Sequence, residues 1–262
     1  MWIDTHIHLD AAEYAGQQTQ LLAAARREGV SAWVIPAVWP SNFDAVRMLA
    51  HATPGGAYAL GIHPMFAQQC APDALDTLQA ALEAHKNDPK LVAVGEIGLD
   101  YFVPDLNPAL QAHYFKAQLK LAQRYGLPVI MHVRRSADHI AKYLRQTPVP
   151  SGIAHAFNGS LQQAQALVDL GLCLGFGGAA TYGRALQIRE RLKTLPMSSL
   201  VLETDGPDIA PEWLARQVNP PAALARIGAV LAGIRCMDAP EFATHCAANS
   251  LRVLPRLRAA LA

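Results

Sequence analysis

Short apolar segments alternate with amphipathic segments along almost the whole chain. Eight of the apolar segments have the length and residue types of β-strands. They cover residues 2–9, 31–38, 57–64, 91–100, 127–133, 152–157, 172–178 and 200–208. A strand is therefore predicted about once every thirty residues, with room for a helix in each interval.

The intervening segments carry helix signals. We predict helices over residues 42–51, 72–85 and 108–124. Ser41 is placed to cap the first, and the other two begin with proline, which fits a first helical turn. Within the third, Phe115 and Leu119 follow the four-residue spacing of a helix face.

Strands that alternate with helices indicate parallel βαβ units, and eight such units close into a (β/α)₈ TIM barrel of about 250 residues. No linker or low-complexity segment interrupts the chain, so we expect one domain over residues 1–262. Terminal helices from about residue 238 are expected to cover the barrel. The alternative architecture is an open doubly wound sheet, which would bind its ligand at one switch point.

Polar residues at the strand ends favour the barrel, because its parallel strands bring their carboxyl ends to one mouth. Nearly every predicted strand ends in a histidine or a carboxylate. These residues are His6, His8, His63, Glu96, Asp100, His132, His155 and Asp205. Singly, each has a structural explanation, such as a hydrogen-bonded histidine or a buried ion pair. Their joint arrival at one end of several strands predicts a functional site.

Charge and cysteine content narrow the class of protein. Lysine and arginine number 22 against 21 aspartate and glutamate, for a formal net charge of +1, which argues against non-specific coating of nucleic acid. The four cysteines form no CxxC pair, and neither a signal peptide nor an apolar segment of about 20 residues is visible. We expect a soluble cytoplasmic protein with no obligate protein partner.

The strand ends hold a set of metal-ligand types. In a strand, His6 and His8 would share one face, with Asp4 in line below them. Imidazole and carboxylate together suit zinc, manganese or iron, and carboxylates also admit magnesium. Six candidate ligands are too many for one four-coordinate ion. A pair of metals about 3.5–4 Å apart with a shared carboxylate fits better.

We expect Glu96 to be the shared carboxylate. One metal would take His6, His8 and Glu96 with Asp205 nearby, and the other would take Glu96, His132 and His155. Glu96 and Asp205 are also the predicted catalytic residues, since a metal-activated water would be the nucleophile. The predicted cofactors are two divalent ions, Mg²⁺, Mn²⁺ or Zn²⁺.

Residues near these ligands are candidates for positioning and substrate binding. Asp100 lies four residues after Glu96 and is expected to orient a ligand. Arg134 would share the strand face of His132 and hold a phosphate, or else it is a surface arginine paired with a carboxylate.

Two further features have both a functional and a structural reading. Tyr101, Phe102 and Phe157 follow strand ends and would either stack on a base or pack the rim. The glycine-rich segment 175–184 follows the seventh strand and would either admit a phosphate or form a tight turn.

Six motifs resemble those of TatD-type metal-dependent hydrolases, the TatD deoxyribonuclease group of amidohydrolase-like barrels. They are DTHIHLD, GIHP, VGEIGLDY, LPVIMHVRR, HAFNGS and ETDGPD, in the family's order and followed by NPP at Asn219. The resemblance spans about residues 1–257. It implies a TIM barrel, divalent metals, phosphodiester hydrolysis and the same six ligands. It also implies that His63 contacts the substrate phosphate.

The predicted function is therefore a metal-dependent phosphodiesterase or DNase resembling a 3'-end exonuclease. Its expected substrate is DNA with single-stranded or frayed ends, because a duplex is too wide for the barrel mouth. An amidohydrolase or an esterase, for example one acting on a D-aminoacyl-tRNA ester, is the alternative. A non-catalytic metal-binding partner protein is a third possibility, against which the complete ligand set argues.

Overall fold

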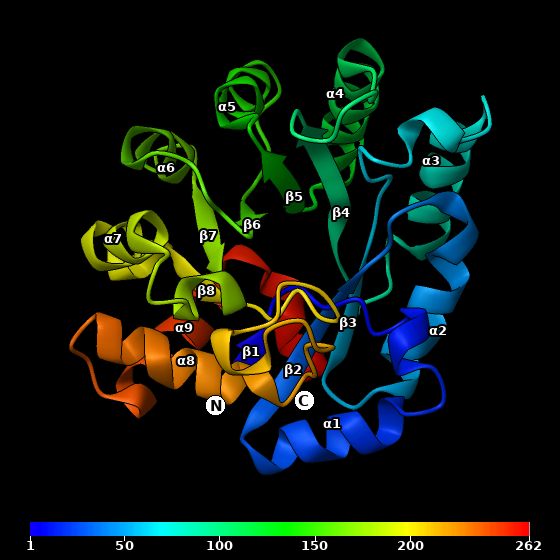
Figure 1. Ribbon diagram of the computed structural model, residues 1–262. Helices are drawn as coiled ribbons and strands as arrows, with labels where there is room; N and C mark the ends of the chain where they lie inside the picture. Colours follow the sequence, from blue (N-terminus) through cyan, green and yellow to red (C-terminus); the bar gives the residue numbers. More distant parts are fainter. Residues whose placement is uncertain (262) are drawn as a thin grey trace.

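The computed structural model describes residues 1–261 as eight parallel strands surrounded by helices (Figure 1). The strands are β1 (Trp2–Asp4), β2 (Val30–Pro36), β3 (Gly56–Leu60), β4 (Leu91–Asp100), β5 (Val129–Arg134), β6 (Gly152–His155), β7 (Leu172–Phe176) and β8 (Leu200–Leu202). They are hydrogen-bonded in chain order from β1 to β8. The predicted (β/α)₈ barrel is confirmed.

The helices follow the strands in turn. They are α1 (Gln18–Arg27), α2 (Phe43–Ala52), α3 (Ala74–His85), α4 (Pro108–Tyr125), α5 (Ala137–Gln146), α6 (Leu161–Val168), α7 (Leu186–Thr194), α8 (Ala223–Ile234) and α9 (Ala239–Val253). Short 3₁₀ segments include η2 (Pro40–Asn42), η4 (Gly178–Thr181) and η7 (Pro255–Ala260). Within residues 1–261, none of the helices has the length and apolarity needed to cross a membrane.

Contacts just beyond β1 and β8 close the barrel. The Thr5 N–H donates to the Leu202 carbonyl at 3.0 Å, and the Asp205 N–H donates to the His6 carbonyl at 2.9 Å. The fully buried Asp4 carboxylate accepts from the backbone N–H and the hydroxyl of Thr204, at 3.0 and 2.6 Å. The two ends of the sheet are therefore joined next to the residues that were predicted to bind metal.

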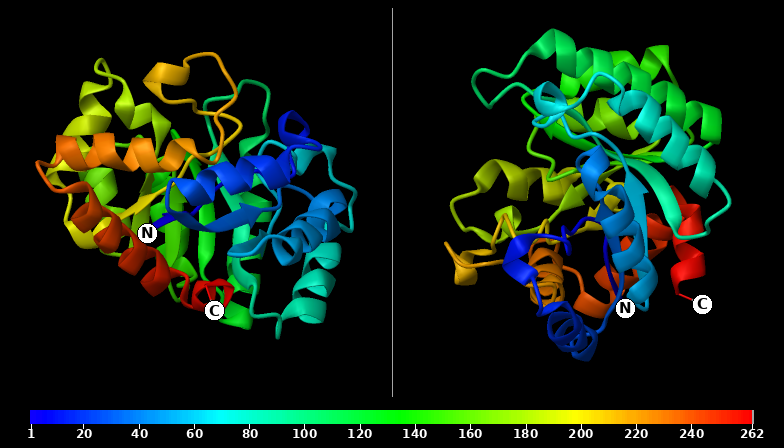
Figure 2. Two further views of the ribbon diagram at one scale, coloured as in Figure 1. Left: turned by 90° about the horizontal axis from the view of Figure 1, so that it is seen from below. Right: turned by 90° about the vertical axis from the view of Figure 1, so that its right-hand side faces the viewer.

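The barrel interior is filled by small and branched apolar side chains. Ile3, Val34, Ala59, Ile130 and Val201 belong to this inner cluster. Residues of α9, of η7 and of the junction between them complete it, namely Ala247, Val253, Leu254 and Leu257. Figure 2 shows this red C-terminal segment at one end of the strands, with the gold loop that follows β8 at the other. The predicted terminal helices therefore close the end opposite the mouth.

Several predicted boundaries are wrong. β1 ends at Asp4 and β8 at Leu202, so the chain leaves the strands before it reaches His6 and Asp205. The His6 N–H donates to the Asp4 carboxylate at 3.3 Å. This local contact between residues two apart is typical of a turn, whereas a strand residue would bond to the neighbouring strand. Ser41 lies within η2, and α2 begins at Phe43 without a side-chain cap.

Two glycines allow a test of packing in the barrel wall. Gly152 of β6 is paired with Val129 of β5, and a Cβ there would lie 2.6 Å from the Val129 carbonyl oxygen. Gly233 lies inside α8, where a Cβ would meet no described atom within 4 Å. The first glycine is required by close approach of the backbone, whereas the second is not.

We predict that Gly152→Ala lowers the free energy of unfolding by about 1–3 kcal/mol, because the added methyl group must displace a neighbouring strand. The matched control Gly233→Ala should raise it by about 0.5–1 kcal/mol, since alanine favours the helix. Urea denaturation followed by circular dichroism measures both. Equal midpoints for the two variants would contradict this account of the wall.

Candidate metal centre

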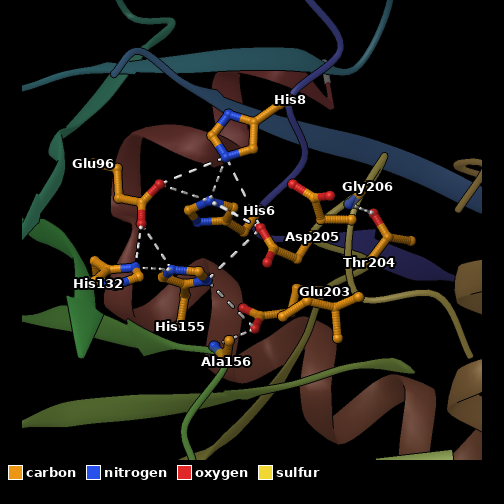
Figure 3. A network of polar contacts seen from close by, with 12 residues as sticks. His6, His8, Glu96, His132, His155, Ala156, Glu203, Thr204, Asp205 and Gly206 are labelled. Atoms are coloured by element: carbon orange, nitrogen blue, oxygen red, sulfur yellow. Dashed lines mark hydrogen bonds and ion pairs between the residues drawn. The ribbon is translucent and has the colours of Figure 1, made fainter. Parts of the chain in front are cut away.

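The six predicted metal ligands meet at the carboxyl ends of the strands (Figure 3). Glu96 and His132 lie on β4 and β5, and His155 is the last residue of β6. The other three follow strand ends, with His6 and His8 after β1 and Asp205 after β8. His6, Glu96, His155 and Asp205 are buried, while His8 and His132 are partly exposed. The mouth of the barrel therefore brings together all six residues.

The Glu96 carboxylate lies between two pairs of imidazole nitrogens. Its Oε2 is 3.2 Å from His6 Nε2 and 3.6 Å from His8 Nε2. Its Oε1 is 2.8 Å from His155 Nε2 and 3.2 Å from His132 Nδ1. In Figure 3 the dashed lines from the two oxygens diverge to these two pairs. Each oxygen of one carboxylate thus faces a separate pair of ring nitrogens, and Oε1 also faces His63 Nε2 at 3.2 Å.

The nitrogens within each pair are close to one another. The Nε2 atoms of His6 and His8 are 3.2 Å apart, and His132 Nδ1 is 3.5 Å from His155 Nε2. Asp205 Oδ1 lies 3.5 Å from His6 Nε2, on the side of the first pair. Converging imidazole and carboxylate donors are the set that binds zinc, manganese or iron. The residues present therefore fit a divalent metal.

Asp100 fixes the orientation of His132. Its Oδ2 accepts from His132 Nε2 at 2.9 Å, which leaves Nδ1 as the ring nitrogen that faces Glu96. Burial raises the pKa of Asp100, but hydrogen bonds from His132 and from the backbone N–H groups of Val103 and Phe102 outweigh burial and lower it to about 2. The carboxylate is thus ionised in the folded protein near neutral pH. This geometry agrees with the orienting role predicted for Asp100.

His63 faces the same carboxylate as a hydrogen-bond donor. Its Nδ1 accepts from the Met65 N–H at 3.2 Å, so the ring proton resides on Nε2, which is 3.2 Å from Glu96 Oε1. The pKa of His63 is lowered by burial, although the charge of Glu96 opposes this shift. In its neutral form the His63 ring has one N–H and one lone pair, and the lone pair on Nδ1 already accepts from Met65. Nε2 therefore presents an N–H to the centre and not a lone pair that could bind metal.

Glu203 is a buried carboxylate that sequence analysis missed. Its Oε1 accepts from the Ala156 N–H and lies 3.9 Å from His155 Nδ1, the ring nitrogen turned away from Glu96. Burial raises the pKa of Glu203 to about 8, while the positive charge of His155 acts in the opposite direction. Gly175 leaves the space for it, because a Cβ there would lie 2.1 Å from Glu203 Oε2. The available signal was its place two residues before Asp205 in ETDGPD.

Arg134 lies at the rim and not among the ligands. Its guanidinium stacks on Phe102, with Cζ 3.9 Å from the ring centroid, and Nη1 is 3.9 Å from Asp100 Oδ2. Arg135 packs on the same ring at 4.6 Å. Of the aromatic residues considered for base stacking, Phe157 is buried and Tyr101 packs edge-on against His139. Packing explains Phe157 better than base stacking does.

Comparison with known proteins decides the family. The family model described as "TatD related DNase" matches residues 3–255. The chain belongs to the TatD-related DNase family. This confirms the resemblance seen in the motifs, and with it the prediction of a metal-dependent hydrolase.

Relatives in this TatD family align over nearly their full length. The chain is 42% identical to the uncharacterized metal-dependent hydrolase YjjV of Escherichia coli, over 92% of this chain and 93% of that protein. It is 30% identical to the 3'-5' ssDNA/RNA exonuclease TatD of Erwinia billingiae, over 95% and 97% of the two chains. The crystal structure of E. coli YjjV matches with a TM-score of 0.92 at 40% identity, covering 97% of this chain and 98% of that one.

We predict that the neutral ring of His63 carries its proton on Nε2 in the metal-free protein, because the Met65 N–H occupies Nδ1. Long-range ¹H–¹⁵N correlation spectra of protein labelled at histidine nitrogens measure the tautomer, and His63→Gln assigns the signal. A proton on Nδ1 would show that His63 offers a lone pair to the centre and could bind metal there.

Proposed function

We propose that this TatD-family hydrolase cleaves phosphodiester bonds at single-stranded ends of nucleic acid, as a 3'-end exonuclease, with two divalent metal ions. One observation carries the proposal. The two oxygens of Glu96 each face a separate pair of imidazole nitrogens, at 2.8–3.6 Å. One shared carboxylate between two donor pairs is the arrangement typical of two-metal hydrolases.

The six ligands would divide into two sets around Glu96. His6, His8 and Asp205 lie on the side of Oε2, and His132 and His155 lie on the side of Oε1. Mixed nitrogen and oxygen donors suit Mn²⁺ or Zn²⁺, and the carboxylates also admit Mg²⁺. When bound, such ions would supply a water molecule of lowered pKa and neutralise charge on the phosphate oxygens.

The protein's own groups would then bind and orient the diester. The Asp205 side chain is 12% exposed and that of Glu96 only 2%, so Asp205 is the carboxylate that an attacking water can reach. We assign it the role of accepting that water's proton. The His63 Nε2–H and the Arg134 guanidinium would donate hydrogen bonds to phosphate oxygens, which hold the phosphorus in place for attack.

Two observations support the end of a single nucleic-acid strand as the substrate: the burial of the centre and the activity for which a relative is named. His6 is fully buried and Glu96 nearly so, at the bottom of a barrel mouth. The end of a single strand is narrower than a duplex, so it reaches ligands buried at strand ends in the barrel mouth more readily. The relative from Erwinia billingiae is named a 3'-5' ssDNA/RNA exonuclease. A single strand that enters by its end satisfies both observations.

Replacement of Glu96 tests the shared carboxylate. Glu96→Ala should cut activity at least about a hundredfold and reduce bound metal from two ions per chain, since both sites lose a ligand. Glu96→Gln keeps the shape without the charge and should lose nearly as much. Elemental analysis and turnover measure the two effects, with the exposed Glu241→Gln as control. Full occupancy and turnover in Glu96→Ala would refute the shared role.

Replacement of His63 or Arg134 separates phosphate binding from ester chemistry in general. Each alanine variant should keep its metal and lose roughly tenfold or more in kcat/KM on a charged diester, because a charge-assisted hydrogen bond contributes about 1.5–3 kcal/mol. An uncharged ester should be affected less, and the exposed His113→Ala serves as control. Equal losses on both substrates would favour an ester hydrolase, such as one acting on aminoacyl esters.

DNA of different topology tests the requirement for an end. With Mg²⁺ or Mn²⁺, end-labelled single strands should be shortened from the 3' end, blunt duplex more slowly, and covalently closed circular duplex not at all. Gel electrophoresis of the labelled products gives the polarity. Rapid cutting of relaxed circular duplex would contradict entry by a strand end.

A further inference from the structure

A cavity of about 620 Å³ lies between the segments that follow β7 and β8, and it takes no part in the chemistry described above. The segment after β7 lines it with Tyr182 and Arg184, and the segment after β8 lines it with Asp208, Ile209 and Arg216. Because the carboxyl ends of parallel strands lie at one end of the barrel, these two lining segments start from the same end as the metal ligands. Asp208 is only three residues beyond Asp205.

Two guanidinium groups give the cavity a positive lining. Arg184 and Arg216 are exposed, and in residues 1–261 neither has a carboxylate within ion-pairing distance. Asp208 is the one carboxylate among the lining residues, so the formal charge of the lining is positive. The rest of the wall is the Tyr182 ring, Ile209 and three alanines. Such a wall suits a ligand with both an anionic group and a flat, weakly polar one.

The cavity is held in shape by hydrogen bonds between its two segments. The Tyr182 hydroxyl donates to the Ala210 carbonyl at 3.2 Å, and the Glu212 N–H donates to the Thr181 hydroxyl at 2.9 Å. Behind the wall, the fully buried Asn219 amide donates to the carbonyls of Thr204 and Asp208, at 2.8 and 3.1 Å. The same turn therefore carries Asp205 of the metal centre and the edge of the cavity.

Backbone strain is concentrated in the segment after β8. Ile209 has φ of 41° and Arg216 has φ of 66°, in the left-handed region that a β-branched residue rarely occupies. Ile209 is also an exposed apolar side chain, at 37%. Strained residues persist where the surrounding structure holds them and are common at ligand sites. The strained backbone at Ile209 thus accompanies an apolar side chain in the lining of the cavity.

We propose that this cavity binds the nucleotide adjoining the cleaved phosphodiester, so that the enzyme holds two successive residues of a single strand. Arg184 and Arg216 would bind its phosphate, and its base would lie against Tyr182 and Ile209. This inference rests on the proposed nuclease function and deepens it. Arg184 lies over the Tyr182 ring, with Cζ 5.4 Å from the ring centroid, so both groups are at hand on one side of the cavity. The other arginines at the mouth, Arg134 and Arg135, pack more closely on Phe102 and do not line this cavity.

The test compares substrates of different length in the full-length, metal-loaded enzyme. In the double variant Arg184→Gln/Arg216→Gln, the ratio of kcat/KM for pentathymidylate over that for bis-p-nitrophenyl phosphate should fall at least about tenfold, since two charge-assisted contacts are lost. Arg27→Gln/Arg258→Gln removes the same charge from exposed sites on α1 and η7 and is the control. An unchanged ratio would overturn the proposal.

Binding without turnover separates this proposal from the proposed function. Fluorescence anisotropy of labelled pentathymidylate in EDTA should show binding to the wild-type protein, weakened at least tenfold in the double variant and not in the control. Wild-type protein that cleaves no diester would refute the nuclease function, and the binding measurement would still decide the cavity. Absent binding, or equal binding by wild type and double variant, would overturn the proposal.

Discussion

The structure of this site depends on one buried carboxylate surrounded by five imidazoles. Burial alone would raise the pKa of Glu96, but its interactions with the imidazoles of His155, His63, His6 and His132 outweigh burial and hold that pKa well below its usual range. A buried charge without such partners would be strongly destabilising. Because each imidazole comes from a different strand end or from the turn after β1, the carboxylate can be compensated only when the whole barrel has assembled. Site and fold are therefore coupled through Glu96.

Closure of the barrel between β1 and β8 also positions two residues of the same centre, His6 and Asp205. Asp4 and Thr204 are hydrogen-bonded across the closure, although they are 200 residues apart in the chain. These bonds fix the turns that carry His6 and Asp205, whose side chains lie 3.5 Å apart. Asn219 braces the turn after β8 from behind, and Asp100 orients His132 from the side of β4. The turns that carry His6 and Asp205 are therefore held by hydrogen bonds from buried polar side chains to their backbone.

Local sequence patterns were sufficient to predict the eight strands and to gather the six ligand candidates, because apolar runs and their polar ends are short-range signals. The features that these patterns could not predict depend mostly on contacts between residues far apart in the sequence. The end of β1 before His6 follows from Asp4 and Thr204. The buried Glu203 needs the space left by Gly175 on the neighbouring strand. The paired arginines of the cavity lie 32 residues apart. The predicted proton position on His63 depends on a local turn that brings the Met65 N–H to Nδ1, and residue types alone do not indicate that turn.

The central claim is that the two oxygens of Glu96 face two separate metal sites. Anomalous diffraction from crystals grown with Mn²⁺ or Zn²⁺, with data collected on both sides of the metal absorption edge, tests it most directly. The account predicts two anomalous peaks per chain, one between Glu96 Oε2 and the pair His6 and His8, the other between Oε1 and the pair His132 and His155. A single peak at saturating metal, or a peak ligated by His63 in place of one of these pairs, would contradict it.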